Sequence, residues 1–374
     1  MGEKGIDTWI TFTREGNPDP VAADLGLGGV VWRSAGIFEA DGQSIAIVGN
    51  LDAEGVRQKG IYDDVIGYGK EGASKSLYEY VRRRKPKTIA VNSSYDFGLA
   101  DGLSSGMRHY LRASLREFAR NFVTAEDLVI TLRSKLIPKE LDLMRKSVQM
   151  CEKILRIAEE DFIRIGRTDR EIRDMIQDQV RKMGLGFSWE EDFCPVVVVG
   201  DNEFGHRGFA NRTLRRNELL HFDFGVNYQG YCSDIQRVYF VGGRPPDSVR
   251  RLFEATKKAT DAGVEALKPG VKGYVVDRAC RQSVMSSGYP EYLHGTGHVV
   301  GRATHEIGPM LSPRWRERYG RTMEKKLIAG MIFTVEPSVK GEDGVCNIER
   351  ELLLTSKGAE AFSTPEDELY ELAG

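Results

Sequence analysis

The chain has 374 residues, of which 41% are hydrophobic and 29% charged, and its formal net charge is -2 at pH 7. These values are typical of a water-soluble globular protein with room for two domains. A slightly acidic chain gives no sign of a nucleic-acid partner or of an anionic membrane partner. No stretch approaches 18 consecutive apolar residues, so no transmembrane helix is expected.

The cysteines indicate a reducing compartment. They are odd in number, stand singly and form no Cys-x-x-Cys pair, which argues against a disulfide framework. The five positions are Cys151, Cys194, Cys232, Cys280 and Cys346. The N-terminus also lacks the apolar stretch of a signal peptide. We therefore expect a cytoplasmic protein.

The first third of the chain alternates short apolar runs with helical patterns. Residues 45–48 and 88–92 have the composition of buried strands, and residues 73–84 have the spacing and charge of a helix. This alternation predicts an α/β domain over residues 1–133, with a small sheet covered by helices.

A domain boundary is expected just before Pro138, which suits the first turn of a helix. From Leu141 to Phe162 the apolar residues alternate spacings of three and four, which predicts a long amphipathic helix. A coiled coil is the alternative, but the pattern lasts only three heptads. Thr168 and Glu171 form a capping-box pattern that opens a second helix.

Strands dominate from about residue 194 onward. Helical patterns interrupt them only at about 248–267 and 273–287. Residues 139–374 are therefore predicted to form an α+β domain, and every chemical motif of the chain lies within it.

The most informative stretch is residues 223–234, in which two aspartates bracket a short polar centre between apolar runs. The pattern predicts a β-hairpin with its turn centred between Tyr228 and Gln229, which would place Asp223 directly opposite Asp234. Such opposed side chains lie roughly 4.5–5.5 Å apart at Cβ. Two carboxylates that close repel each other unless a positive charge lies between them, so the hairpin predicts a site for one or two divalent cations.

The histidines gather downstream of this hairpin. His294, His298 and His305 fall within a dozen residues, and glycines flank His298 on both sides, which permits close backbone packing around a site. We interpret this group as functional. His109 and His221 are interpreted as ordinary histidines, His221 as a strand residue that faces away from Asp223.

Two glutamates complete a ligand set. Glu336 lies in an apolar strand, where a carboxylate is costly unless it is paired or bound to a metal. Glu349 and Glu351 share one face of another strand, and their spacing alone cannot choose between them. Four carboxylates and one imidazole form a hard ligand set that favours Mn²⁺ and accepts Co²⁺ or Zn²⁺. Two ions about 3.5–4 Å apart could share bridging carboxylates.

The order and context of these residues resemble the pita-bread metallopeptidases, which include methionine aminopeptidase, Xaa-Pro aminopeptidase and prolidase. The resemblance covers residues 139–374. The N-terminal third is similar to the creatinase-type N-terminal domain of the proline-directed branch. The resemblance therefore implies an α/β N-terminal domain over residues 1–133 and an α+β pita-bread catalytic domain over residues 139–374.

The resemblance also implies roles for single residues. The family's last ligand lies six residues before a threonine that ends a strand, and Thr355 points in this way to Glu349 rather than Glu351. The implied ligands of two divalent ions are Asp223, Asp234, His298, Glu336 and Glu349. Glu336 would also shuttle a proton. The other histidines that match functional positions are His206 and His305, for the scissile bond, and His294, for the proline side or the substrate's C-terminus.

Two positions depart from the family's pattern. Gln236 stands where the family usually has threonine, and Asn347 stands where it usually has arginine. Arg302 or Arg350 could compensate for the second change. These departures leave the expected metal site intact and the substrate preference open.

The resemblance implies dinuclear metal-dependent hydrolysis of the Xaa-Pro bond in short peptides by a homodimer. An Xaa-Pro dipeptidase is favoured over an Xaa-Pro aminopeptidase acting on longer peptides, because the N-terminal domain is short. A different hydrolase or lyase reaction at the same metals is an alternative. A non-catalytic binding protein is another, but such relatives typically lose ligands, and this chain keeps all five.

Overall fold

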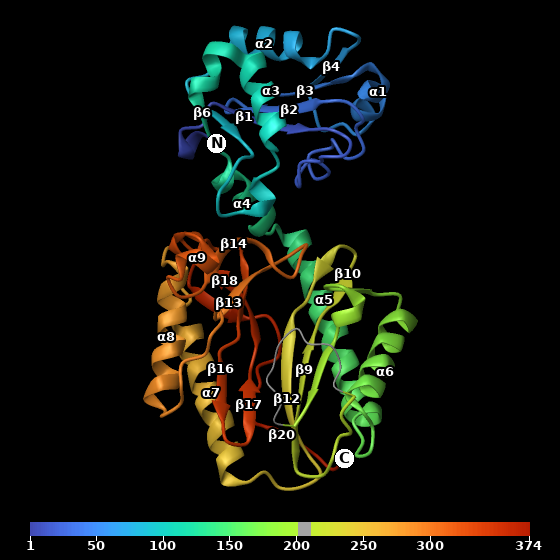
Figure 1. Ribbon diagram of the computed structural model, residues 1–374, viewed down its shortest axis with the longest axis vertical. Coiled ribbons are helices and arrows are strands. Elements are labelled where there is room, and N and C mark those ends of the chain that lie inside the picture. Colours follow the sequence, from blue (N-terminus) through green and yellow to red (C-terminus); the bar gives the residue numbers. More distant parts are fainter. Residues whose placement is uncertain (201–210) are drawn as a thin grey trace. The chain divides into compact units, whose positions relative to one another are not determined.

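The structure is a computed structural model that describes residues 1–200 and 211–374. The chain divides into two compact units, Met1–Leu132 (unit 1) and Arg133–Gly374 (unit 2), which are labelled by element in Figure 1. His206 belongs to the segment between the described ranges, so its predicted role lies outside the described residues.

Unit 1 is built on a six-stranded sheet with the strand order β4-β3-β2-β1-β5-β6. The strands β1, β5 and β6 run parallel to one another, as do β3 and β4, whereas β2 is antiparallel to its neighbours. Their bounds are β1 (Thr8–Thr13), β2 (Ser34–Glu39), β3 (Ser44–Gly49), β4 (Asp64–Tyr68), β5 (Ile89–Val91) and β6 (Phe122–Thr124).

Both faces of this sheet are buried. Alternate side chains of a strand point to opposite faces, and helices cover each face. Ile45 and Ile47 of β3 pack with the helices α2 (Ala73–Arg84) and α3 (Ser105–Leu115). Ala46 and Val48 pack on the other face with α1 (Asn50–Gln58). The predicted helix at 73–84 and the α/β organisation are thus confirmed. The helix α4 (Glu126–Ser134) carries the chain from unit 1 into unit 2.

Unit 2 contains a four-stranded sheet, β20-β12-β9-β8, and a five-stranded sheet, β14-β13-β15-β18-β19, with smaller sheets β11-β10-β7 and β16-β17. The first half of the unit contributes β7 (Gly186–Phe187), β8 (Val196–Val199), β9 (Glu218–Phe224), β10 (Val226–Tyr228), β11 (Tyr231–Cys232) and β12 (Ile235–Val241). The second half contributes β13 (Gly297–Val300), β14 (Glu306–Leu311), β15 (Ile332–Val335), β16 (Ser338–Gly341), β17 (Gly344–Asn347), β18 (Arg350–Thr355), β19 (Gly358–Ala361) and β20 (Tyr370–Leu372).

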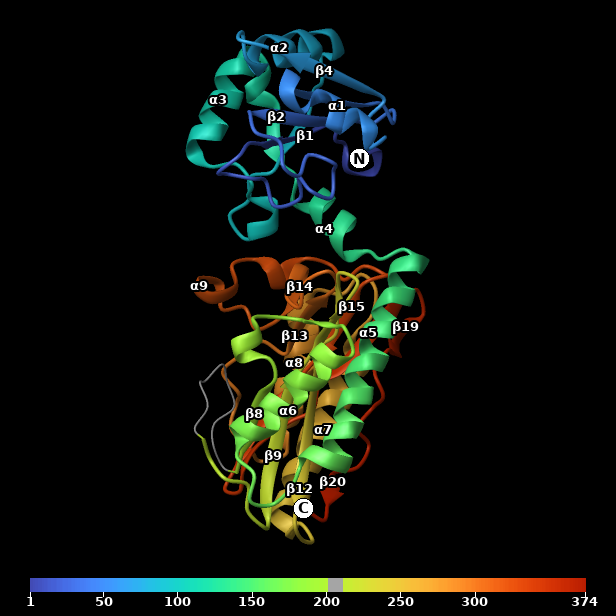
Figure 2. The same ribbon diagram turned by 90° about the vertical axis from the view of Figure 1, so that its right-hand side faces the viewer.

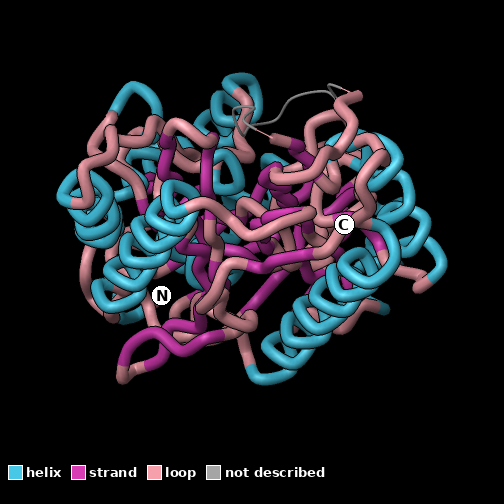
Figure 3. Tube along the Cα trace, turned by 90° about the horizontal axis from the view of Figure 1, so that it is seen from below, coloured by secondary structure: helices cyan, strands magenta, loops and turns pink. Residues whose placement is uncertain are grey.

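The helices of unit 2 lie on the outside of its strands, as Figure 3 shows from below. The helices α5 (Pro138–Ile157) and α6 (Asp169–Lys182) lie over β9 and β12 (Figure 2). The helices α7 (Asp247–Ala266) and α8 (Gly273–Ser286) pack together, α7 against β16 and β17 and α8 against β14. A short helix, α9 (Arg316–Tyr319), follows β14.

The ends of α5 and α6 show how far the local sequence sets these helices. Thr168 and Glu171 form the predicted capping box, in which each backbone N–H bonds the other residue's side chain. The first helix was expected to continue to Phe162, but α5 ends at Ile157 and a π-helical turn follows. The wider turn brings Glu159 to the Tyr239 hydroxyl, which donates to it at 2.8 Å.

The packing of α5 and α6 decides which face of the four-stranded sheet is free for chemistry. Leu220, Phe222 and Phe224 of β9 join the core beneath these helices. Because side chains alternate along a strand, Asp223 faces the opposite side of the sheet. Within the described part of the chain, no helix is both long and apolar enough to cross a membrane.

Candidate metal centre

The register of β9 and β12 differs from the predicted hairpin. Asp223 pairs with Gln236, not with Asp234, so the predicted pairing was wrong by two residues. The turn has Gln229 and Gly230 at its centre, both with positive φ, and such turns favour glycine at the second central position. A shift by an even number of residues keeps the side chains on the same face; burial raises the pKa of Asp234, and the Asp223 carboxyl is close enough to raise it further.

Three buried side chains converge on one point of unit 2. Asp234 lies just before β12, His298 lies in β13 and Glu349 lies just before β18. Each of the three offers an atom that lies within 4.8 Å of those of the other two. The His298 Nε2 atom is 3.5 Å from Asp234 Oδ2 and 3.5 Å from Glu336 Oε1, so Glu336 adjoins the same group.

Close backbone packing makes this convergence possible. A Cβ atom at Gly297 would lie 2.1 Å from the carbonyl oxygen of Thr334, so only glycine lets β13 approach β15 here. The Thr334 hydroxyl accepts a hydrogen bond from the His298 N–H at 3.1 Å. Sterics thus explain why a glycine stands beside His298, as the sequence pattern indicated.

The His298 ring is held as a neutral ligand would be. Its Nδ1 lies 3.2 Å from the carbonyl oxygen of Val299, so Nδ1 carries the proton and donates, and Nε2 is left as the free electron pair facing the carboxylates. Burial, together with the neighbouring His305, lowers the pKa of His298 to about 3. His298 therefore stays neutral at physiological pH.

The carboxylates of the group are costly in the ionised form. Burial raises the pKa of Asp223 to about 7 and that of Glu336 to about 8, and the mutual repulsion of the acids adds to the shift of Glu336. Burial, and then the neighbouring acids, also raise the pKa values of Asp234 and Glu349 well above the ordinary range. Both oxygens of Glu349 are buried and have no hydrogen-bond donor among the described residues. Divalent cations would relieve this repulsion, and the oxygen-rich donor set with one imidazole fits such ions.

The structure distinguishes the two glutamates that the spacing alone left open. Glu349 belongs to the converging group, whereas Glu351 Oε1 accepts a hydrogen bond from the backbone N–H of Asp234. Glu351 is fully buried and lies opposite Thr334 in the register of β15 and β18. Its place is therefore behind the group, where it fixes the backbone of Asp234.

The remaining histidines differ in their surroundings. The exposed ring of His305 lies edge-on to His298, with 4.3 Å between ring centroids. Both ring nitrogens of His294 have partners, the Gly295 carbonyl and the Ser338 hydroxyl, each at 2.7 Å. His221 is buried two residues before Asp223 in an unbroken strand, so the two share a face, and the expectation that His221 faces away was wrong.

The structure also describes the contacts that bear on the two departures from the family's pattern. The Gln236 Nε2 atom donates to Glu336 Oε2 at 2.8 Å, a contact that the sequence did not suggest. Of the two arginines considered as substitutes for the missing one, Arg302 donates to Glu140 at 2.9 Å and Arg350 donates to Asp261 at 2.7 Å. Sequence reasoning also missed the structural roles of Thr334 and Glu351; only their polarity within apolar strands gave any signal.

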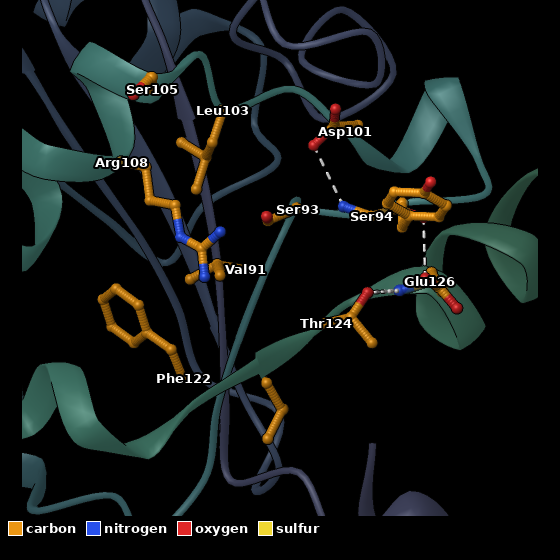
Figure 4. A pocket seen from close by; sticks show the side chains of 12 residues that line it. Val91, Ser93, Ser94, Asp101, Leu103, Ser105, Arg108, Phe122, Thr124 and Glu126 are labelled. Carbon is orange, nitrogen blue, oxygen red and sulfur yellow. Dashed lines mark hydrogen bonds between the residues drawn. The ribbon is translucent and has the colours of Figure 1, made fainter.

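Unit 1 has a hollow of about 600 Å³ of a different kind (Figure 4). It lies where β5 and β6 end, and Arg108 points into it. Its acidic groups already have donors, since Asp101 accepts from the Ser94 N–H and Glu126 from the Ser94 hydroxyl. The hollow therefore differs from the candidate metal centre, in which Glu349 has no hydrogen-bond donor among the described residues.

Known proteins resemble this chain over almost its whole length. It is 27% identical over 336 residues to an uncharacterized peptidase of Staphylococcus saprophyticus, covering 87% of each chain. The structure is similar to a Xaa-Pro dipeptidase from Bacillus anthracis (TM-score 0.74, 23% identity, 99% of this chain and 96% of that one). It is also similar to an X-Pro aminopeptidase from Thermotoga maritima (TM-score 0.72, 23% identity, 98% of both). These likenesses confirm the predicted fold, an α/β N-terminal domain followed by a pita-bread catalytic domain.

The family follows from the match to the model of metallopeptidase family M24. That match covers residues 142–356, which is more than half of the chain and includes all five predicted ligands. The chain belongs to metallopeptidase family M24.

Proposed function

We propose that this protein is a dinuclear metal-dependent peptidase that cleaves the Xaa-Pro bond of short peptides, acting as an Xaa-Pro dipeptidase. The observation that carries the proposal is the convergence of Asp234, His298 and Glu349 within 4.8 Å, in which both oxygens of Glu349 lack a donor. The substrate class is supported by the solved structures that resemble both units of the chain, a Xaa-Pro dipeptidase and an X-Pro aminopeptidase.

The ligands of two divalent ions would be Asp223, Asp234, His298, Glu336 and Glu349. Such a set of hard oxygens with one imidazole is suited to Mn²⁺, while Co²⁺ and Zn²⁺ would also be accepted. The ions would supply Lewis-acid activation of the scissile carbonyl and of the attacking water. None of the buried cysteines belongs to the group.

The chain's own residues would then manage protons and orientation. Glu336 adjoins the ligand group through His298 and would carry the proton from water to the leaving prolyl nitrogen. His305, exposed beside His298, would donate to the carbonyl oxygen as negative charge develops. His206 is proposed for the same region on the resemblance alone.

His294 is proposed to recognise the proline side of the substrate or its C-terminus. Because its Nδ1 donates to Gly295, its Nε2 is an acceptor that the Ser338 hydroxyl now occupies. For His294 to contact a substrate, Ser338 must therefore turn away or become part of the contact. This makes Ser338 a neighbour to consider in any variant of His294.

The proposal extends to the compartment and the oligomeric state of the protein. The five cysteines are all free and buried, which supports a reducing compartment such as the cytoplasm. A homodimer follows from the resemblance and is checked by the molar mass in solution. Xaa-Pro aminopeptidase activity on longer peptides is the second candidate, since the resemblance to the X-Pro aminopeptidase is as extensive as that to the dipeptidase.

The test is hydrolysis of Ala-Pro, Ala-Pro-Ala and Ala-Ala by metal-stripped protein refilled with Mn²⁺. Cleavage of Ala-Pro alone identifies a dipeptidase, and cleavage of both proline peptides identifies an aminopeptidase. Protein that binds Mn²⁺ but cleaves none of the three contradicts the proposed substrate class. Asp234→Asn is the control, since it removes a ligand charge at nearly constant volume.

A further inference from the structure

Gln236 is a polar residue of a strand whose side chain is buried beside acidic residues. It lies in β12 opposite Asp223, on the face of the sheet turned away from α5 and α6. Its side chain is buried, with 4% exposure. The terminal amide is therefore enclosed among the carboxylates of the candidate metal centre.

The amide makes one well-defined contact, with Glu336. Its Nε2 donates to Glu336 Oε2 at 2.8 Å, while Glu336 Oε1 lies 3.5 Å from His298 Nε2. The two oxygens of Glu336 thus have different partners, one on the Gln236 amide and one toward the ligand group. A carboxylate only accepts, so the N–H end of the amide must be the end that faces it.

The contact also joins two separate sheets. Gln236 belongs to the four-stranded sheet, whereas Glu336 follows directly after β15 of the five-stranded sheet. A threonine side chain, which the family usually has at this position, is two atoms shorter and cannot reach as far. The longer amide is this chain's own means of spanning the gap.

The oxygen of the Gln236 amide indicates that this residue does not serve to stabilise the fold. Gln236 Oε1 is buried without a hydrogen-bond partner in the described part of the chain, and an unpaired buried acceptor opposes folding. A residue selected only for packing would be apolar here. This combination of one oriented donor and one unsatisfied acceptor is typical of functional sites.

We propose that Gln236 is a positioning residue, which holds Glu336 by one carboxylate oxygen and so directs the other oxygen toward the cation site beside His298. It acts through Glu336 and does not touch the reacting atoms. The inference rests on the proposed function, because it assigns Glu336 to metal binding and proton transfer. It would explain how a chain without the family's usual threonine keeps this glutamate oriented.

The experiment compares Gln236→Met with wild type by Mn²⁺ calorimetry of the metal-stripped protein. Removing a hydrogen-bond partner of a metal ligand typically costs about 10- to 100-fold in metal affinity or activity, and we expect a loss of this size. The kcat on a cleaved substrate should fall similarly, while KM changes less than about threefold, because the contact affects the ligand shell and not substrate binding. Unchanged Mn²⁺ affinity together with unchanged kcat would overturn the proposal.

Gln177→Met is the matched control. Gln177 is also a buried glutamine of unit 2, with 5% exposure, and its Nε2 donates to the Glu191 and Cys194 carbonyls and to none of the five proposed ligands. The same substitution there should lower Tm without weakening Mn²⁺ binding. An equal loss of Mn²⁺ affinity in both variants would show a general effect of core disruption and would contradict positioning.

A double-mutant cycle with Glu336→Gln identifies the route of the effect. If Gln236 acts through Glu336, Gln236→Met should cause no further loss of Mn²⁺ affinity in the Glu336→Gln background; additive losses would contradict this. Should Gln236→Met fail to fold, Gln236→Leu, which also lacks the amide donor, replaces it in the cycle, and the absence of any effect of that variant would count against the proposal. The Mn²⁺ affinities do not depend on a peptide, so they remain decisive even if no Xaa-Pro bond is cleaved.

Discussion

Two buried acidic regions of this molecule differ in whether their carboxylates have hydrogen-bond donors. In unit 1, Asp19 is 2% exposed, and its carboxylate accepts hydrogen bonds from the Asn92 side chain and from the Val21 N–H. In unit 2, the acids of the candidate metal centre face one another, and Glu349, 3% exposed, has no donor in the described structure. The first region supplies its own donors, whereas the second brings several acids together and leaves Glu349 without a donor among the described residues.

This difference shows how a buried acid with a purely structural role can be distinguished from one that could bind a metal ion. Burial is the largest cause of a raised carboxyl pKa in both regions, for Asp19 to about 6 and for Glu336 to about 8. The distinguishing signs are the convergence of several acids and the missing protein donors. A divalent cation would be a suitable partner for the second region, whereas the Asp19 carboxylate already accepts hydrogen bonds from Asn92 and Val21.

The largest expected effect comes from removing ligand charge in unit 2. Glu349→Gln should lower kcat/KM by about 10³-fold or more, since metal-ion catalysis contributes several kcal/mol to the transition state. The metal-free variant should also unfold at a higher temperature than metal-free wild type, because one repelling group is gone. Peptide hydrolysis and thermal unfolding in a chelator measure the two effects. Activity that survives both the substitution and chelation would contradict the comparison.

The next effect is the response to the cation itself. At about 100 times its dissociation constant, each bound Mn²⁺ ion should stabilise the folded wild-type protein by about 2.7 kcal/mol, because it binds the folded state only. Thermal unfolding with and without Mn²⁺ measures the shift. In Asp19→Asn the shift should stay at the wild-type value, and in Glu349→Gln it should shrink. An equal shift in all three proteins would place the ion elsewhere.

A third prediction concerns the backbone that forces the acids together. Gly297→Ala places a methyl group against the Thr334 carbonyl, so β13 and β15 must separate, at a cost of about 1–3 kcal/mol. The displacement should weaken Mn²⁺ binding as well. The control is Gly55→Ala in α1, where nothing lies within 4 Å of the new Cβ and a gain of about 0.5–1 kcal/mol is expected. Denaturant unfolding and Mn²⁺ calorimetry give both results, and unchanged Mn²⁺ affinity in Gly297→Ala would be contrary to the proposed packing role.

The smallest effect tests the region of unit 1. The Asp19 pKa is raised from 3.8 to about 6 in the folded protein, so between these values the folded state holds a proton that the unfolded state has lost. Wild-type stability therefore falls as pH rises through this window, by about 1.4 kcal/mol per pKa unit. Asp19→Asn lacks this loss, so it should gain about 1.4 kcal/mol on wild type between about pH 5 and pH 7. A gain that is independent of pH would contradict the assigned titration.

The sequence predicted well those features that local residues decide. The helix at 73–84 and the capping box of Thr168 and Glu171 follow from nearby spacing and from side chains that bond the adjacent backbone. Asp234 and His298 could be proposed from the residues, because paired aspartates and a glycine-framed histidine need an explanation, whereas the choice of Glu349 over Glu351 depended on the family resemblance. In the structure these three side chains, Asp234, His298 and Glu349, lie together.

What the sequence could not predict depends on register and on contacts between sheets. Moving the hairpin turn by one residue, to Gln229 and Gly230, moves the partner of Asp223 by two. The contact of Gln236 with Glu336 joins residues a hundred positions apart in different sheets, and no local pattern encodes it. Distant pairing of this kind is settled only when the sheets pack.

The order of the site's elements along the chain has a consequence for biosynthesis. Asp223 and Asp234 flank one hairpin and leave the ribosome together, whereas Glu349 follows only after α7, α8 and the strands β13 to β17. Since chains grow at about 5–20 residues per second, the first two carboxylates wait several seconds for the last one. A nascent chain would therefore present only part of the proposed ligand set. The complete set would exist only once the fold is finished.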